Sequence, residues 1–309
     1  MVKKILMVGL ALFSFFGVNA QQDAMFTHYS FNTLAVNPGY AGSRDALTVT
    51  GLNRSQWVGF PGAPTTQTLT LHAPIMNEKI GLGLSVLKDK IGPTNQTAFY
   101  ADFAYKIKVG KGKLAFGLKG GLNMVSNDIK DLSTTSGNDL AFQENTQSQL
   151  LPNFGFGVYY SAAKYYVGLS TPRLLENNYE SNTTSGSING EKRHYFFIAG
   201  MIFNLNETGS IKLKPTTFVK LTEGAPLEVD LTALFYIHDK YWVGPMLRTG
   251  DAVGVLAGLD ITDQFSLGYS FDWSYGNQTF KYNSGSHELM LRYDFIFNEK
   301  GNIKSPRYF

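Results

Sequence analysis

Apolar and polar side chains alternate residue by residue in short segments between residues 46 and 297 of this 309-residue chain. In residues 265–273, every second position carries an aromatic or leucine side chain: Phe265, Leu267, Tyr269, Phe271 and Trp273. Successive side chains of a β-strand point to opposite faces, so such a segment has one apolar and one polar face. A helical period of 3.6 would spread the same residues around the helix axis. The alternation therefore predicts an all-β chain.

About fourteen segments share this period, and the connections between them form two sets. The predicted strands are residues 46–58, 65–73, 80–88, 95–107, 114–126, 152–161, 165–171, 193–204, 211–221, 226–237, 241–248, 252–261, 264–273 and 287–297. Short connections alternate with a set that includes three long polar ones, 127–151, 172–192 and 274–286. This arrangement is typical of a transmembrane up-and-down antiparallel β-barrel, with short turns in the periplasm and longer loops outside. Lipid offers no hydrogen bonds to the backbone, so the sheet must close on itself.

A soluble β-sandwich is the alternative for an alternating chain, and aromatic residues near strand ends favour the membrane barrel. In a barrel they would form girdles at the two membrane interfaces. The aromatic residues near predicted strand ends are Trp57, Tyr100, Tyr105, Tyr165, Tyr166, Tyr195, Tyr241, Trp242 and Trp273.

The polar faces carry charges, which we expect to point into the barrel lumen. A charge that faced hydrocarbon at the membrane midplane would cost about 2–4 kcal/mol. The predicted lumen charges, which we expect to be solvated or mutually paired, are Arg54, Asp102, Lys106, Lys119, Lys212, Lys214, Lys220, Asp230, Asp260, Asp272, Arg292 and Asp294.

Residues 1–20 have the pattern of a signal peptide. Lys3 and Lys4 precede an apolar run of about 14 residues, shorter than the ~20 that span a membrane as a helix. The small residues Val18 and Ala20 then define a cleavage site before Gln21. We therefore expect an exported, outer-membrane protein. The chain has no cysteine, which excludes a lipid-modified cysteine, a disulfide and thiol catalysis.

The sequence shows no pattern that predicts catalysis or a cofactor. The five histidines are scattered singly, without metal-ligand spacing. The glycine-rich runs, such as residues 117–121 and 254–258, lie within strand patterns and not at a strand-to-helix turn, so we interpret them as wall glycines. The net charge of +3 does not indicate a nucleic-acid partner. We predict a non-enzymatic protein without a cofactor or a metal; a membrane esterase stays an alternative, because a catalytic triad can assemble from distant residues.

The two ends of the chain resemble a known family. Residues 21–74, QQDAMFTHYSFNTLAVNPGYAGSRDALTVTGLNRSQWVGFPGAPTTQTLTLHAP, are similar to the N-terminal signature of the PorP/SprF family of type IX secretion membrane proteins. The last four residues, PRYF, are similar to its closing motif, and the middle matches in strand rhythm and length. The resemblance implies an outer-membrane barrel of a Bacteroidota-type bacterium. It also implies partners in the type IX apparatus and, in gliding species, surface adhesins. It leaves open whether the protein is a core subunit or serves one adhesin.

Residues 21–45 precede the first strand and are too apolar for a solvated tail. We expect this periplasmic or plug segment to fold into the barrel mouth or to dock on a periplasmic partner; a plug that only seals the pore is the alternative. Asn37, Pro38 and Gly39 should form a tight turn, in which Gly39 adopts a positive φ. The residues predicted to make these contacts are Phe31, Asn32, Leu34, Asn37, Pro38, Gly39 and Tyr40.

Two further segments are candidate contact surfaces. The first outward connection, residues 54–68, is rich in glycine and proline, which suits a preformed binding loop. Trp57 itself fits the aromatic girdle. Residues 298–309 should form a periplasmic tail. The candidate partner-binding residues in these segments are Trp57, Phe60, Pro61, Gly62, Pro64, Arg307, Tyr308 and Phe309. We therefore expect a barrel that binds, secretes or anchors type IX cargo, such as the C-terminal domain of an adhesin, and couples it to periplasmic proteins. A channel for small or hydrophobic solutes is the alternative.

Overall fold

The computed structural model describes residues 25–76, 78–128, 146–177, 191–276 and 281–296. Two short helical elements, α2 (Thr33–Val36) and η1 (Pro38–Tyr40), precede a series of β-strands. The strands are β1 (Leu47–Ser55), β2 (Thr65–Ile75), β3 (Ile80–Ile91), β4 (Thr94–Val109), β5 (Gly112–Asn127), β6 (Thr146–Ser161), β7 (Tyr165–Thr171), β8 (His194–Met201), β9 (Phe203–Asn204), β10 (Ile211–Thr222), β11 (Glu228–Ile237), β12 (Tyr241–Arg248), β13 (Ala252–Asp260), β14 (Phe265–Ser274) and β15 (Ser286–Phe295).

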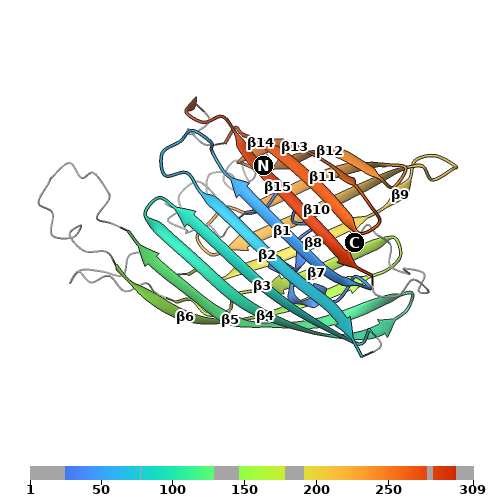
Figure 1. The fold of residues 1–309 in the computed structure, drawn as a ribbon, viewed down its shortest axis with the longest axis horizontal. Helices are drawn as coiled ribbons and strands as arrows, with labels where there is room; N and C mark the ends of the chain where they lie inside the picture. The colour runs from blue at the N-terminus through green and yellow to red at the C-terminus, as the bar shows by residue number, and fades with distance from the viewer. Residues whose placement is uncertain (1–24, 77, 129–145, 178–190, 277–280, 297–309) are drawn as a thin grey trace, which may run out of the picture.

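The strands form one closed antiparallel sheet (Figure 1). Sequential neighbours pair around the ring, and β1 closes it by pairing with β15 from Leu47 opposite Phe295 to Ser55 opposite His287. The two-residue β9 continues β8 past Ile202, because both pair with β10. The described strands thus make a fourteen-strand barrel, which confirms the predicted fold class.

The two ends of the barrel differ in their connections, as the sequence predicts. One end, here the short-turn end, carries the connections 76–79, 110–111, 162–164, 205–210, 238–240 and 261–264. The opposite long-loop end carries 56–64, 92–93, 128–145, 172–193, 223–227, 249–251 and 275–285. In a transmembrane barrel, short turns face the periplasm and long loops face outward.

The outer face of the barrel is apolar and the lumen holds the charges. Neighbours on β5 show the contrast, because Leu118 is 58% exposed whereas Lys119 is 3% exposed. Ten of the predicted lumen charges are buried; Lys212 and Asp260 are partly exposed. Within the described ranges, no helix is long and apolar enough to cross a membrane.

Four aromatic residues predicted for the girdles lie elsewhere: three face the lumen, and Trp57 lies at the barrel rim, where its indole donates to Ser274. Tyr105, Tyr165, Tyr195, Tyr241 and Trp273 do point outward, each 44–50% exposed. In contrast, Trp242 and Tyr166 are buried in the lumen at 2% and 3% exposure, and Tyr100 lines a cavity there. The prediction was wrong for these three because proximity to a strand end does not say which face a residue occupies.

A charge on the outer face of β5 should destabilise the barrel. We expect L118R, near the middle of the strand, to lower the free energy of unfolding by about 2–4 kcal/mol, because the guanidinium would enter hydrocarbon. Denaturant unfolding in lipid vesicles measures this difference. The matched control is L205R at the short-turn end, where the leucine is 52% exposed and the cost should be near zero. Equal stability of the two variants would contradict a lipid-facing β5.

Candidate functional site

The lumen is occupied by residues 25–45, which we call the plug segment. The segment starts beside Lys220, near the long-loop end of β10, where the Met25 sulfur lies 3.0 Å from the lysine Nζ. It ends beside Asp294, near the short-turn end of β15. Between these points it contacts strands from around the whole ring. The residues that the sequence singled out here are buried against the protein's own strands: Phe31, Asn32, Leu34, Asn37, Pro38, Gly39 and Tyr40.

Both hydrophobic clusters of the described structure form between the plug segment and the lumen wall. In the first, Tyr29 stacks on Phe218 with ring centroids 5.0 Å apart. In the second, Phe31 stacks on Trp242 at 4.6 Å. Burial raises the pKa of the Tyr29 phenol well above its usual value, so its hydroxyl stays protonated beside Thr216 Oγ1, 2.9 Å away. The plug segment therefore supplies the apolar partners that the inner wall needs.

A group of buried charges holds the beginning of the plug segment, and we call Arg54, Asp272 and Glu288 the anchor cluster. The Glu288 carboxylate accepts the backbone N–H groups of Thr27 and His28 at 2.9 and 2.7 Å, and contacts His28 Nδ1 at 2.7 Å. Asp272 accepts the Thr27 hydroxyl at 2.6 Å and the Arg54 guanidinium at 2.7 Å. All three side chains of the cluster are at most 2% exposed, so these charges depend on one another and on the plug.

Hydrogen bonds continue along the plug segment. The Asn32 amide donates to Thr68 Oγ1 at 3.0 Å and accepts from Thr70 at 2.8 Å. Further along, the Ser170 hydroxyl donates to the Val36 carbonyl at 2.7 Å. These bonds satisfy polar groups of the segment that are removed from water.

A second set of polar contacts holds the end of the plug segment. The Arg44 guanidinium donates to both carboxylate oxygens of Asp294, at 3.2 and 2.7 Å. Burial alone would lower the pKa of Arg44, but the Asp294 carboxylate and the Tyr40 hydroxyl raise it above its ordinary value, so the pair stays ionised. Two residues earlier in the chain, the Gly42 carbonyl accepts from the Lys106 ammonium, and the Gly42 N–H donates to His72 Nδ1 at 3.2 Å.

Glycines on the inner wall make room for the plug backbone. A Cβ on Gly81 would overlap the Ala41 carbonyl, and one on Gly117 would overlap the backbone of Pro38 and Gly39. A Cβ on Gly157 would overlap the Asn37 side chain. The sequence pattern identifies these residues only as glycines of the barrel wall and misses this role. A glycine in a strand indicates that another group packs closely against the backbone, but it does not identify that group.

The turn at residues 37–39 differs in one respect from the prediction. The Gly39 N–H donates to Asn37 Oδ1 at 2.8 Å, and the Asn37 amide donates to the Val158 carbonyl at 3.1 Å. Gly39 itself lies in η1 without a positive φ, so that expectation was wrong; the positive φ falls on Gly42, at 62°. A side chain at position 39 would have little room, because a Cβ there would lie 3.1 Å from Tyr159 Cβ.

The other predicted contact residues lie away from the plug. Phe60, Pro61 and Gly62 are exposed in the β1–β2 loop, and Pro64 is half-buried at its end. Trp57 is also half-buried, and its indole N–H donates to the lumen-facing Ser274 hydroxyl at 3.1 Å, which places it at the barrel rim and not in the outer girdle. Arg307, Tyr308 and Phe309, like the predicted signal peptide and tail, lie outside the described residues. In the described ranges, no three His, Asp or Glu side chains are grouped to hold a metal ion.

Comparisons with known proteins give a family and several structural neighbours. The model of the family described as "Type IX secretion system membrane protein PorP/SprF" matches residues 18–293. No curated protein matches the chain. Similar solved structures include the outer membrane protein Omp33 of Acinetobacter baumannii, with a TM-score of 0.48, 10% identity, and coverage of 82% of this chain and 100% of that one. The KdgM porin has a TM-score of 0.39 and 9% identity, and the match covers 81% of this chain and 100% of that one.

A side chain on a wall glycine should loosen the plug segment. We expect G117V to expose the segment, because overpacking a filled site costs about 1–3 kcal/mol. Chymotrypsin digestion of the folded barrel, followed by mass spectrometry, measures cleavage at the plug aromatics. The matched control is G51V, since a Cβ at Gly51 meets no atom within 4 Å. If G117V and G51V are cut equally slowly, the glycines do not accommodate the plug.

Loss of the Glu288 carboxylate should release the start of the plug segment. We expect E288A to destabilise plug docking by about 3–5 kcal/mol, because it leaves Arg54 short of a counter-ion and two plug N–H groups unpaired. In a W57F/W273F background, Trp242 reports docking through its stack on Phe31. Its emission should shift to longer wavelength in E288A and stay unchanged in the neighbouring control H287A. An unshifted E288A spectrum would show that the cluster does not hold the plug.

Proposed function

Since the chain belongs to the PorP/SprF family of type IX secretion system membrane proteins, we propose that it acts in the outer membrane as a closed receptor for secreted cargo. The observation that carries the proposal is the plug segment inside the barrel. Fourteen strands enclose enough space for a solute path. Here that space holds two aromatic stacks and the anchor cluster. These contacts support a receptor over the alternative of a diffusion channel.

The β1–β2 loop is the proposed cargo-binding element at the long-loop end. Its start is fixed by backbone bonds from Val58 to Gly285 and from Ser284 to Val58, at 2.9 and 2.8 Å, and by the Trp57 indole bond to Ser274. Gly59 and Gly62 adopt positive φ values of 91° and 73°, and Phe60 stays 37% exposed between them. A preformed loop with an exposed aromatic side chain loses little conformational entropy on binding a protein domain.

The short-turn end is the proposed site of coupling to periplasmic components of the system. Apolar side chains in its turns are exposed: Met76 at 70%, Leu205 at 52% and Ile261 at 45%. Strand β15 also ends there, so the chain continues from this end toward Arg307, Tyr308 and Phe309. An apolar rim on this face would suit contact with a partner protein better than contact with water.

Deletion of the gene tests the proposed role directly. We expect the deletant to lose type IX cargo from its surface, and the wild-type gene to restore it, as measured by antibody labelling of intact cells. A double variant, Phe60→Ser with Pro61→Ser, should restore far less cargo, because truncation of a hot-spot residue at the centre of an interface costs about 2 kcal/mol or more. The matched control is Y282S, since Tyr282 is exposed by 71% on another loop of the same end.

Two outcomes would contradict this proposal. Normal cargo display in the deletant would remove the secretion role. A steady open conductance of the purified wild-type protein in planar bilayers would instead favour the channel.

A further inference from the structure

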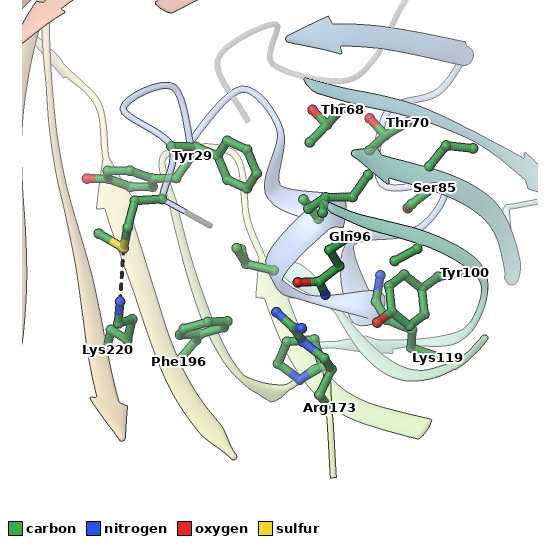
Figure 2. Close-up of a pocket in the computed structure, with 18 of the residues that line it drawn as sticks. Tyr29, Thr68, Thr70, Ser85, Gln96, Tyr100, Lys119, Arg173, Phe196 and Lys220 are labelled. Atoms are coloured by element: carbon green, nitrogen blue, oxygen red, sulfur yellow. Dashed lines mark hydrogen bonds between the residues drawn. The ribbon is translucent and has the colours of Figure 1, made fainter. Parts of the chain in front are cut away.

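A cavity with about 750 Å³ of empty space, its opening included, lies between the plug segment and the inner wall (Figure 2). Lys220 and Phe196 lie on one side of it, Thr68, Thr70 and Ser85 on another, and Arg173 extends toward Gln96. Pro172 and Arg173 follow β7 at the long-loop end, so the cavity lies in that half of the lumen. This space is distinct from the loop surface proposed for cargo.

Most of the cavity wall is apolar. The plug contributes Phe26, Ala35 and Val36, and the strands contribute Leu87 and Phe218, among others. Sites for small molecules are commonly lined by apolar and aromatic side chains, with a few polar groups that orient the ligand.

The charged groups in the wall are all cations. Lys119, Arg173 and Lys220 line the cavity, and no aspartate or glutamate is among its described lining residues. Lys119 has a carboxylate of Asp102 behind it at 3.0 Å, and Arg173 has one of Glu191 at 3.6 Å. Because each carboxylate partner lies outside the described lining, the cavity presents cationic N–H donors to a ligand, and an anionic oxygen is their strongest acceptor.

Lys220 has the weakest close contacts of the three cations. Its side chain is 6% exposed, and its ammonium lies 3.0 Å from the Met25 sulfur and 3.7 Å from a Glu228 carboxylate oxygen. An ammonium carries three N–H donors, whereas a thioether is a weak acceptor. The Glu228 carboxylate forms an ion pair with this ammonium at 3.7 Å, and an anionic oxygen inside the cavity would add a closer, charge-assisted hydrogen bond.

We propose that this cavity binds a small amphipathic carboxylic acid, with the carboxylate on Lys220 and the apolar body against Phe26, Phe196 and Phe218. The apolar wall and the position of the ammonium match this class of ligand. Met25, Phe26, Tyr29, Ala35 and Val36 belong to the plug segment, so the site exists only when the plug is in the lumen. Binding therefore stabilises the plugged barrel by mass action.

Calorimetric titration of the full chain in lipid nanodiscs tests this site. The probe is 4-phenylbutyrate, and 4-phenylbutan-1-ol is the neutral molecule of the same skeleton; empty nanodiscs correct for partition into lipid. We expect the acid to bind at least about tenfold more tightly than the alcohol, as a charge-assisted hydrogen bond requires. K220M should weaken acid binding by a similar factor. The matched control is K212M, which removes a lysine from the same strand outside the cavity and should leave the affinity unchanged.

A cavity-filling variant separates this site from any other binding surface. Ala98 lines the cavity and is 1% exposed, so A98F should abolish acid binding while the barrel still shows its folded mobility on unheated gels. Equal binding of acid and alcohol, full affinity in K220M or A98F, or no heat beyond that of empty nanodiscs would overturn the proposal. None of these results depends on secretion, so the cargo role stands or falls separately.

Discussion

A closed sheet of fourteen strands encloses more space than its own inward side chains can fill, whereas about eight strands leave a lumen that they can fill. This geometric constraint determines the interior of the protein. Trp242 and Phe218 point inward and find their stacking partners, Phe31 and Tyr29, on the plug segment. Without that segment, apolar rings and buried charges would share a wide water-filled bore. The plug segment and the inner side of the barrel wall therefore form the hydrophobic core together.

The plug and the wall depend on each other through contacts that are distant in sequence. Thr27 bonds to Asp272 and Glu288, more than 240 residues away, and these carboxylates also hold Arg54 of the first strand. Strand β1 pairs with β15 at the same place, so the anchor cluster lies across the seam where the ring closes. Closure of the sheet and docking of the plug consequently stabilise the same state. A plug held in this way differs from a loose tail that only blocks a pore.

This packed interior suits the proposed role, in which partners bind at the two ends of the barrel. The inner glycines bring the plug backbone against the wall, and the wall keeps the β1–β2 loop next to the β14–β15 loop through Val58 and Gly285. A loop carried on such a frame can present Phe60 without first becoming ordered. The cavity beside Lys220 differs from these end surfaces because the plug segment forms one of its walls. A ligand there would therefore bind only to the plugged barrel.

The sequence by itself determined the strands and the inward facing of their charges, because alternation along a strand is a local property that lipid outside and charge inside enforce at every second residue. All fourteen segments, and the burial of charges such as Arg54 and Asp272, followed from it. Only the tertiary structure decided that Trp242 and Tyr166 face the lumen, that Gly81, Gly117 and Gly157 border a backbone, and that Glu288 holds the plug. Those roles depend on a partner from another part of the chain, and closure of the ring brings that partner near.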